Sequence, residues 1–129
     1  MIEKKIIRVG KPTKLSEPNL NGILYEPISL KNAINTFLKN EDHIPNVVVL
    51  DSSYDSFKDN EYYTIDLNKT LGYCIDIADD YIEILIDDYY SFISKFKNPI
   101  AMLRLVGERG NNVGEFNVKK IIAIDIREK

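Results

Sequence analysis

The chain has 129 residues, of which 44% are hydrophobic and 29% charged, with a net charge of −3 and one cysteine. This size and composition predict one globular domain, residues 1–129, and exclude global disorder and an internal disulfide. Because the apolar runs are too short to cross a bilayer and no signal-peptide core follows Met1, we expect a cytoplasmic protein with no membrane partner.

The first forty residues predict a strand, a tight turn and a helix. Ile2–Val9 is the expected strand, and Gly10 ends it. Asn19–Gly22 contains the asparagine and glycine residues that favour positive backbone angles in a turn. Ser29 is the expected helix N-cap, because its hydroxyl can accept hydrogen bonds from the first-turn amides. The helix should run to Lys39, with an apolar face made of Leu30, Ala33, Ile34, Phe37 and Leu38.

The middle of the chain predicts a buried strand, a long loop and a β-hairpin. Asn46–Asp51 is rich in β-branched residues, which is typical of a strand in a core. Residues 52–69 are polar and aromatic, and we expect a loop there with a short pairing at Tyr62–Ile65. Tyr73–Ile77 and Tyr81–Ile86 are the two arms of the expected hairpin.

The last third of the chain predicts a short helix and a second hairpin. Asp87 or Asp88 is the expected N-cap of this helix. Ile100–Val106 and Phe116–Ile126 are the expected strands, joined by the glycine-rich turn Gly107–Gly114. The apolar stripe expected on the helix consists of Ile86, Tyr89, Tyr90, Ile93 and Phe96.

These elements predict an α+β fold, because six or so strands and two helices are joined by mostly short connections. We expect a small, mostly antiparallel β-barrel or half-open sheet with two flanking helices.

Charge is unevenly distributed along the chain. Residues 1–40 carry a balance of +4, residues 41–90 a balance of −11, and residues 91–129 a balance of +4. Either the acidic middle and basic ends attract other copies head to tail, or the ends fold beside the middle and neutralise it. In both cases the acidic balance and the lack of a basic stripe argue against a nucleic-acid partner.

The only histidine, His43, is the first candidate for catalysis. A single histidine excludes a multi-histidine metal site, and as a general base it would need a nucleophile and an orienting acid. Ser52 and Ser53, which follow Asp51, are the candidate nucleophiles of such a hydrolase. The alternative is an ordinary histidine in a surface loop.

An acidic hairpin is the second candidate. Six carboxylates lie within residues 76–88, and oxygen-rich clusters of this kind can hold Ca²⁺ or Mg²⁺. The spacing fits no EF-hand loop, and the alternative is a solvated hairpin face whose charges discourage aggregation. The residues that would form this cation site are Asp76, Asp79, Asp80 and Glu83.

Tyrosine is the third candidate, because its rigid ring and polar tip enrich it at protein interfaces. The alternative is that these side chains edge the core. The interface candidates are Tyr62, Tyr63, Tyr81, Tyr89 and Tyr90.

Two further features are interpreted as structural. Gly107–Gly114 lacks the Gly-Lys-Ser/Thr ending of a phosphate loop, and a strand rather than a helix follows it. Cys74 lies in an apolar strand with only acids near it in sequence, which predicts a buried thiol with a raised pKa.

Several of these segments resemble the prohead proteases of tailed bacteriophages, relatives of the herpesvirus assemblin barrel. Asn19–Tyr25 is similar to that family's turn N-x-N-G-x-x-Y, and Leu30–Ile34 to the x-L-x-x-A-I of the helix that follows. Val47–Asp51 is similar to a strand that often ends in Asp-His, and Leu71–Ile77 to the strand I-G-x-V-x-D. Ile121–Ile126 resembles the closing strand.

The resemblance implies a barrel-like fold and, in active members, a serine peptidase. Two positions depart from the family pattern. Ser52 follows Asp51 where the family often has histidine, and Leu103–Gly110 contains no serine where the family has its nucleophile. Because a serine hydrolase needs both groups, the resemblance implies a protease-like barrel without the protease.

The sequence therefore favours a non-enzymatic structural or assembly protein of a phage or prophage particle, with no cofactor. Its partners would be proteins, including copies of itself, and it would act in the cytoplasm or in a particle assembled there. The alternatives are a peptidase of the prohead-protease type that uses His43, and a cation-binding module on the acidic hairpin.

Overall fold

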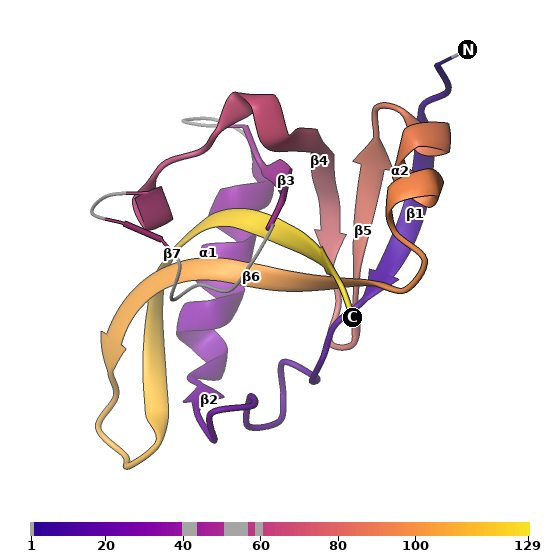
Figure 1. Ribbon diagram of the computed structural model, residues 1–129. Coiled ribbons are helices and arrows are strands. Elements are labelled where there is room, and N and C mark those ends of the chain that lie inside the picture. Colours follow the sequence, from indigo (N-terminus) through magenta and orange to yellow (C-terminus); the bar gives the residue numbers. More distant parts are fainter. Residues whose placement is uncertain (1, 40–43, 51–56, 59–60) are drawn as a thin grey trace.

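The last strand of the chain pairs with three other strands of a mixed, seven-stranded sheet (Figure 1). The structure, a computed structural model, describes residues 2–39, 44–50, 57–58 and 61–129. The strands are β1 (Lys5–Gly10), β2 (Leu24–Tyr25), β3 (Asn46–Val49), β4 (Thr70–Ile77), β5 (Tyr81–Ile86), β6 (Pro99–Arg109) and β7 (Glu115–Glu128), and the α-helices are α1 (Pro27–Lys39) and α2 (Tyr89–Lys95).

The sheet is half-open and not a closed barrel. Its order is β1-β5-β4-β3-β7-β2, and β6 pairs with β7. The pairs β1–β5, β5–β4, β4–β3 and β6–β7 are antiparallel, whereas β2 and β3 are both parallel to β7. Among the described strands β1 comes close to β6, but no ladder joins them, so a seam remains. The α+β class and the half-open sheet are confirmed; closure into a barrel is wrong.

The first helix begins at a different cap from the one expected. The Glu26 carboxylate accepts hydrogen bonds from the backbone N–H groups of Ile28 and Ser29, both at 2.8 Å. These bonds lower the pKa of Glu26. The Ser29 hydroxyl instead donates to the Glu26 carbonyl at 3.0 Å and accepts from the Val118 N–H at 3.0 Å. Ser29 therefore ties α1 to β7, and the predicted apolar face is confirmed by the buried Leu30, Ala33 and Phe37.

The second helix is capped as expected, but its apolar stripe is partly wrong. The Asp88 carboxylate accepts from the Ser91 hydroxyl at 2.8 Å and from the Ser91 N–H at 3.3 Å. Phe92 and Phe96, which are four residues apart, point into the core, so Tyr90 and Ile93 are exposed on the other side of the helix.

The main core lies between α1, α2 and one face of the sheet. Alternate side chains of β5 and β1 enter it, as the period of two in a strand requires. Its largest fully buried members are Phe37, Ile82, Ile84, Ile86, Ile121, Ile124 and Ile126.

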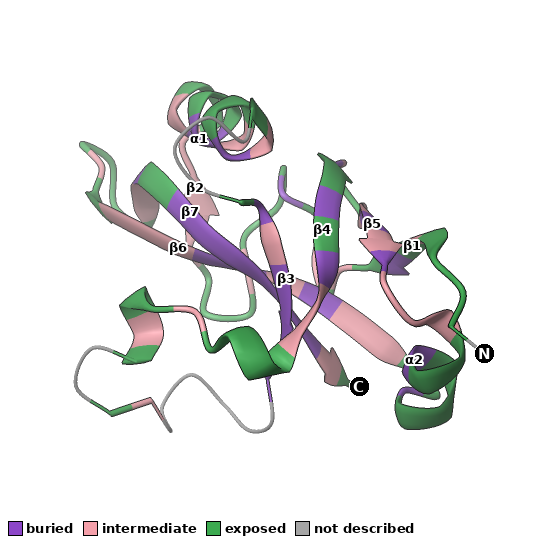
Figure 2. Cartoon of the chain, turned by 90° about the horizontal axis from the view of Figure 1, so that it is seen from above, coloured by how far each residue is buried: buried purple, intermediate pink, exposed green. Residues whose placement is uncertain are grey.

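The opposite face of β3, β6 and β7 is covered by Phe57 and residues 61–69, which lie on the other side of the β6–β7 ribbon from α1 (Figure 2). The expected pairing at Tyr62–Ile65 is wrong, because Glu61–Tyr63 forms a 3₁₀ turn. Tyr62 anchors this segment: its hydroxyl donates to the Leu105 carbonyl at 2.6 Å and accepts from the Leu105 N–H at 3.2 Å. Burial raises the pKa of Tyr62.

An ion pair is buried under this segment. Asp125 is 0% exposed and Arg104 3% exposed, and their side chains form a bidentate pair with Nε 2.9 Å from Oδ2. The second terminal nitrogen of Arg104 donates to the carbonyls of Thr64 at 3.0 Å and Tyr62 at 3.4 Å. The guanidinium carbon lies 4.6 Å from the centre of the Phe57 ring. The pair therefore holds Phe57 and residues 61–64 against two strands, β6 and β7.

The final hairpin is longer than expected. β6 runs to Arg109, and only residues 110–114 form the turn. Gly107 lies in the strand, where an added Cβ would be 2.0 Å from the Asn117 carbonyl oxygen.

Replacing Arg104 with leucine should destabilise the fold by about 3–5 kcal/mol, because Asp125 would remain buried without its paired cation. Urea denaturation measures the free energy of unfolding. The matched control is Lys119→Leu, which removes the exposed 3.3 Å ion pair with Glu108. That control should cost less than about 1 kcal/mol. Equal losses in both variants would contradict the assigned role of the buried pair.

Candidate functional site

One face of the three strands β1, β5 and β4 is exposed and carries apolar side chains in register. Ile6 is the partner of Leu85, and Leu85 is the partner of Tyr73, so the three side chains form a row across the sheet. Ile6 is 57% exposed and Tyr73 42% exposed. Cross-strand partners on the other face, such as Ile7 and Ile84, pack into the core.

A charged row runs beside the apolar row. Arg8 is the partner of Glu83, which is the partner of Asp76. The Arg8 Nε lies 3.2 Å from a Glu83 carboxylate oxygen, and the guanidinium carbon lies 4.5 Å from the centre of the Tyr81 ring. Positive charge thus sits on the edge strand β1 and negative charge on β4. The term outer face denotes the two rows: Ile6, Leu85, Tyr73, Arg8, Glu83 and Asp76.

At this end of the fold, basic and acidic segments of the chain lie beside one another, and Arg8 pairs with Glu83. The basic strand β1 pairs with the acidic strand β5, and the loop after β1 contacts the acidic turn 78–80. The Lys11 ammonium donates to the Asp79 carbonyl at 3.4 Å. This arrangement agrees with the alternative in which the N-terminal basic segment folds beside the acidic middle.

The five tyrosines do not form one surface. Tyr81 lies next to the outer face, under the Arg8 guanidinium, and Tyr89 packs with Lys5, whose Nζ lies 4.4 Å from the ring centre. Tyr90 is exposed on α2, and a hydrogen bond with the Glu3 carboxylate raises its pKa. The remaining two, Tyr62 and Tyr63, lie over β6 instead, where Tyr62 is a structural anchor and Tyr63 is exposed.

The acidic hairpin does not converge on a cation site within the described residues, where no group of three or more potential ligands is found. Glu83 pairs with Arg8, and the Asp79 carboxylate is held by Ser16. Asp76 and Asp80 are exposed.

The residues of the hydrolase alternative, His43, Ser52, Ser53 and Asp51, all lie outside the described residues. Cys74 is buried in β4, as expected, and its thiol donates to the Asp76 carbonyl at 3.6 Å. Burial, followed by the nearby Asp76 charge, raises the pKa of Cys74 to about 12, so the thiol stays protonated and is a poor nucleophile.

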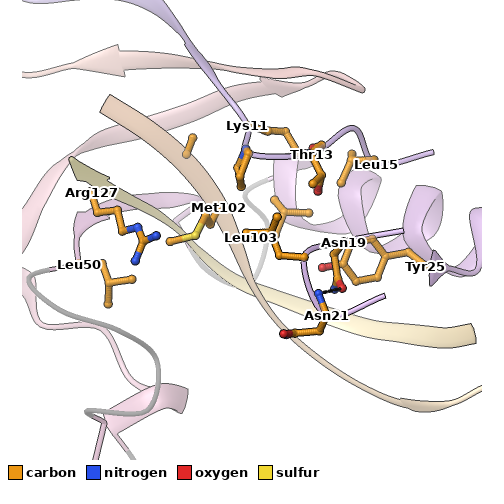
Figure 3. A pocket seen from close by; sticks show the side chains of 13 residues that line it. Lys11, Thr13, Leu15, Asn19, Asn21, Tyr25, Leu50, Met102, Leu103 and Arg127 are labelled. Atoms are coloured by element: carbon orange, nitrogen blue, oxygen red, sulfur yellow. Dashed lines mark hydrogen bonds between the residues drawn. The ribbon is translucent and has the colours of Figure 1, made fainter. Parts of the chain in front are cut away.

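Sequence reasoning missed a pocket of about 400 Å³ at the seam between the end of β1 and strand β6 (Figure 3). Lys11 and Arg127 bring two cations to it from opposite ends of the chain. We call it the seam pocket; its lining residues are Lys11, Pro12, Thr13, Leu15, Asn19, Leu20, Asn21, Tyr25, Leu50, Ala101, Met102, Leu103 and Arg127.

Comparison with known proteins finds no matching family model, no matching curated protein and no matching solved structure. Within the described part of the chain, neither helix has the length and apolar character needed to cross a membrane. Any function must therefore be argued from the surfaces described above.

Asp79 should titrate below the ordinary aspartate pKa of about 3.9. Ser16 holds its carboxylate through the backbone N–H at 2.8 Å and the hydroxyl at 2.9 Å, and these bonds lower the pKa. The carboxylate therefore stabilises the fold above the ordinary pKa, and this contribution is lost as the pH falls through the lowered value.

Carbon-13 NMR of the Asp79 carboxyl group measures this pKa directly. In Ser16→Ala the hydroxyl donor is gone while the backbone donor remains, so the Asp79 pKa should rise part of the way to the ordinary value. An unchanged titration in Ser16→Ala would show that the hydroxyl bond does not hold the charge.

Proposed function

We propose that this chain is a non-enzymatic assembly protein that associates with a second copy of itself through the outer face. The observation that carries the proposal is the row Ile6–Leu85–Tyr73, in which Ile6 and Tyr73 are exposed and Leu85 is half-buried. Contiguous apolar side chains on an otherwise uncovered sheet face mark an interaction surface, because their contact with water costs free energy that a partner removes.

The charges on the outer face favour a second copy as the partner. A two-fold axis parallel to β5 would place Ile6 of one copy over Tyr73 of the other, and Leu85 over its own counterpart. The same axis would bring Arg8 over Asp76 of the second copy, and would place Glu83, whose charge is offset by Arg8 of its own chain, over its own counterpart. A two-fold interface requires such a self-complementary patch.

The kind of particle in which this protein would assemble is inferred from the sequence. The resemblance to prohead proteases supports a structural protein of a phage or prophage particle. The lack of a serine in Leu103–Gly110 supports a role without catalysis. The high pKa of the Cys74 thiol also supports this, because no thiolate nucleophile is offered at neutral pH.

Light scattering should detect a discrete, concentration-dependent oligomer between micromolar and millimolar protein. The patch spans only three short strands, and small interfaces are weak, so we expect rapid exchange with the monomer. Ile6→Glu should shift the protein to a monomer, because it places a charge in the apolar row. Since Ile6 is 57% exposed, the fold should tolerate the change.

Ile28→Glu is the matched control, because it makes the same substitution at a residue that is 71% exposed in the first turn of α1. It should leave the mass unchanged. A wild-type protein that stays monomeric throughout, or equal effects of the two variants, would overturn self-association through the outer face.

Charge reversal tests the two-fold arrangement separately. Arg8→Asp should weaken the oligomer, because it would face Asp76 of the second copy. The double variant Arg8→Asp, Asp76→Arg exchanges the charges and should recover most of the lost association. Sedimentation velocity at low salt, where exposed charges are least screened, is the suitable measurement. A double variant as weak as the single one would rule out this contact.

A further inference from the structure

We infer that the seam pocket binds a small carboxylic acid with an apolar body. This site is separate from the outer face and does not depend on the proposed assembly function. The inference starts from charge: two of the lining residues are cations, Lys11 and Arg127, and none of the lining residues that the structure describes is acidic.

Arg127 carries a donor that lacks an acceptor. Its Nε atom is buried and has no hydrogen-bond partner in the structure. A buried N–H group without a partner is costly, and buried polar groups in folded proteins are nearly always satisfied. An oxygen atom of a bound ligand would satisfy this donor, and a carboxylate suits a guanidinium because two parallel hydrogen bonds can form.

Lys11 supplies a second cation to the same pocket. Its ammonium donates to the Thr13 carbonyl at 2.6 Å and more weakly to the Asp79 carbonyl at 3.4 Å. An ammonium has three donors, so one is left for a ligand. Asp79 and Asp80 both attract this charge, but their carboxylates do not line the pocket. The described wall of the pocket therefore presents net positive charge.

The rest of the wall is mostly apolar, and this decides the class of ligand. Figure 3 places Arg127 and Leu50 at one end of the pocket and Tyr25, Asn19 and Asn21 at the other. The Asn19 side-chain oxygen is already used, since it accepts from the N–H groups of Asn21 and Ile23. The other apolar lining residues are Pro12, Leu15, Leu20, Ala101, Met102 and Leu103.

A ligand that suits this wall has one anionic end and an apolar body. A multiply charged ion, such as free phosphate, would satisfy the cations but leave the apolar wall in contact with water. A neutral apolar molecule would leave Arg127 Nε without an acceptor. The volume of about 400 Å³ lies in the range of ordinary small-molecule sites.

The test is titration of the full chain with 1-naphthoate, with neutral 1-naphthamide as the isosteric control. The chain has two methionines, Met1 and Met102, so a methyl NMR spectrum reports on the pocket wall almost without overlap. We expect a saturable shift of the Met102 methyl and of the Arg127 Nε–H with naphthoate. The amide should bind at least tenfold more weakly.

Single substitutions test which cation binds the carboxylate. Arg127→Met keeps an apolar stem and removes the guanidinium, and it should weaken naphthoate binding at least tenfold. Lys11→Met is the second variant, for the case that Arg127→Met fails to fold, and it should also weaken binding. Arg109→Met removes an exposed cation at the far end of β6, outside the seam pocket, and should change nothing.

Three results would overturn the inference: no saturable shift at millimolar naphthoate, equal binding of acid and amide, or undiminished binding by a folded Arg127→Met or Lys11→Met variant. A short peptide that ends in phenylalanine, with a free or an amidated C-terminus, distinguishes a chain terminus from a free acid as the source of the carboxylate. The monomeric Ile6→Glu variant should bind naphthoate as the wild type does, so failure of the assembly proposal and failure of this one are separable.

Discussion

The buried ion pair between Arg104 and Asp125 is the constraint on which the arrangement of the sheet depends. Removing two charges from water is expensive, and the attraction between them offsets this cost only where the remaining hydrogen-bonding groups are also satisfied. Here the carbonyls of Tyr62 and Thr64 accept from the terminal nitrogen of the guanidinium that does not contact Asp125. Residues 61–64 must therefore lie against β6 and β7. As a result β7 is covered on both faces, by α1 on one and by this segment on the other.

Because the covering elements pack over β7 and its neighbours, the outer face on β1, β5 and β4 is left exposed. Phe57 and residues 61–69 lie on the same side of the sheet as Tyr73 and Ile6, but the described contacts of this segment are with β3, β6 and β7. The longer helix, α1, packs against the opposite side of the sheet. The side chains of Phe92 and Phe96 at α2 also point into the main core on that side. Among the described elements nothing is left to cover the three strands β1, β5 and β4. Their apolar row is exposed because no element of the described part of the chain packs against it.

The sequence predicted the features that depend on near neighbours and missed those that depend on distant ones. The hairpin around residues 78–80 and the apolar face of α1 follow from local periodicity. Ser29 was a reasonable cap by residue type, but Glu26 can reach the same amides, and the Val118 N–H draws the Ser29 hydroxyl away. The contact with Val118, which is distant in sequence, therefore decided which of the two residues, Glu26 or Ser29, caps the helix. For α2, the position of the first helical turn decided which stripe faces inward.

The ion pair and the seam pocket join residues far apart in the chain, so no local pattern could predict them. The sequence nevertheless contained a pattern that indicates the ion pair. Asp125 interrupts the apolar run Ile121–Ile126, and Arg104 interrupts the apolar run of β6. Charges in the middle of two buried strands must be paired, and the two strands form one hairpin. That reasoning predicts the pair, but it does not predict which loop covers it, because Tyr62 and Thr64 are about forty residues away in sequence.

The seam between β1 and β6 results from the hydrogen bonds that the backbone after β1 makes. Beyond Gly10 the N–H groups of Lys11 and Leu15 donate to the carbonyls of Asp80 and Asp79, at 3.0 and 2.9 Å. The chain therefore follows the turn between β4 and β5 and does not extend along β6. Closing the sheet would require these bonds to be broken. It would also bring the Lys11 and Arg127 cations together with less water between them, which is unfavourable. The pocket is thus a product of the topology, with a donor at Arg127 that the protein itself leaves unsatisfied.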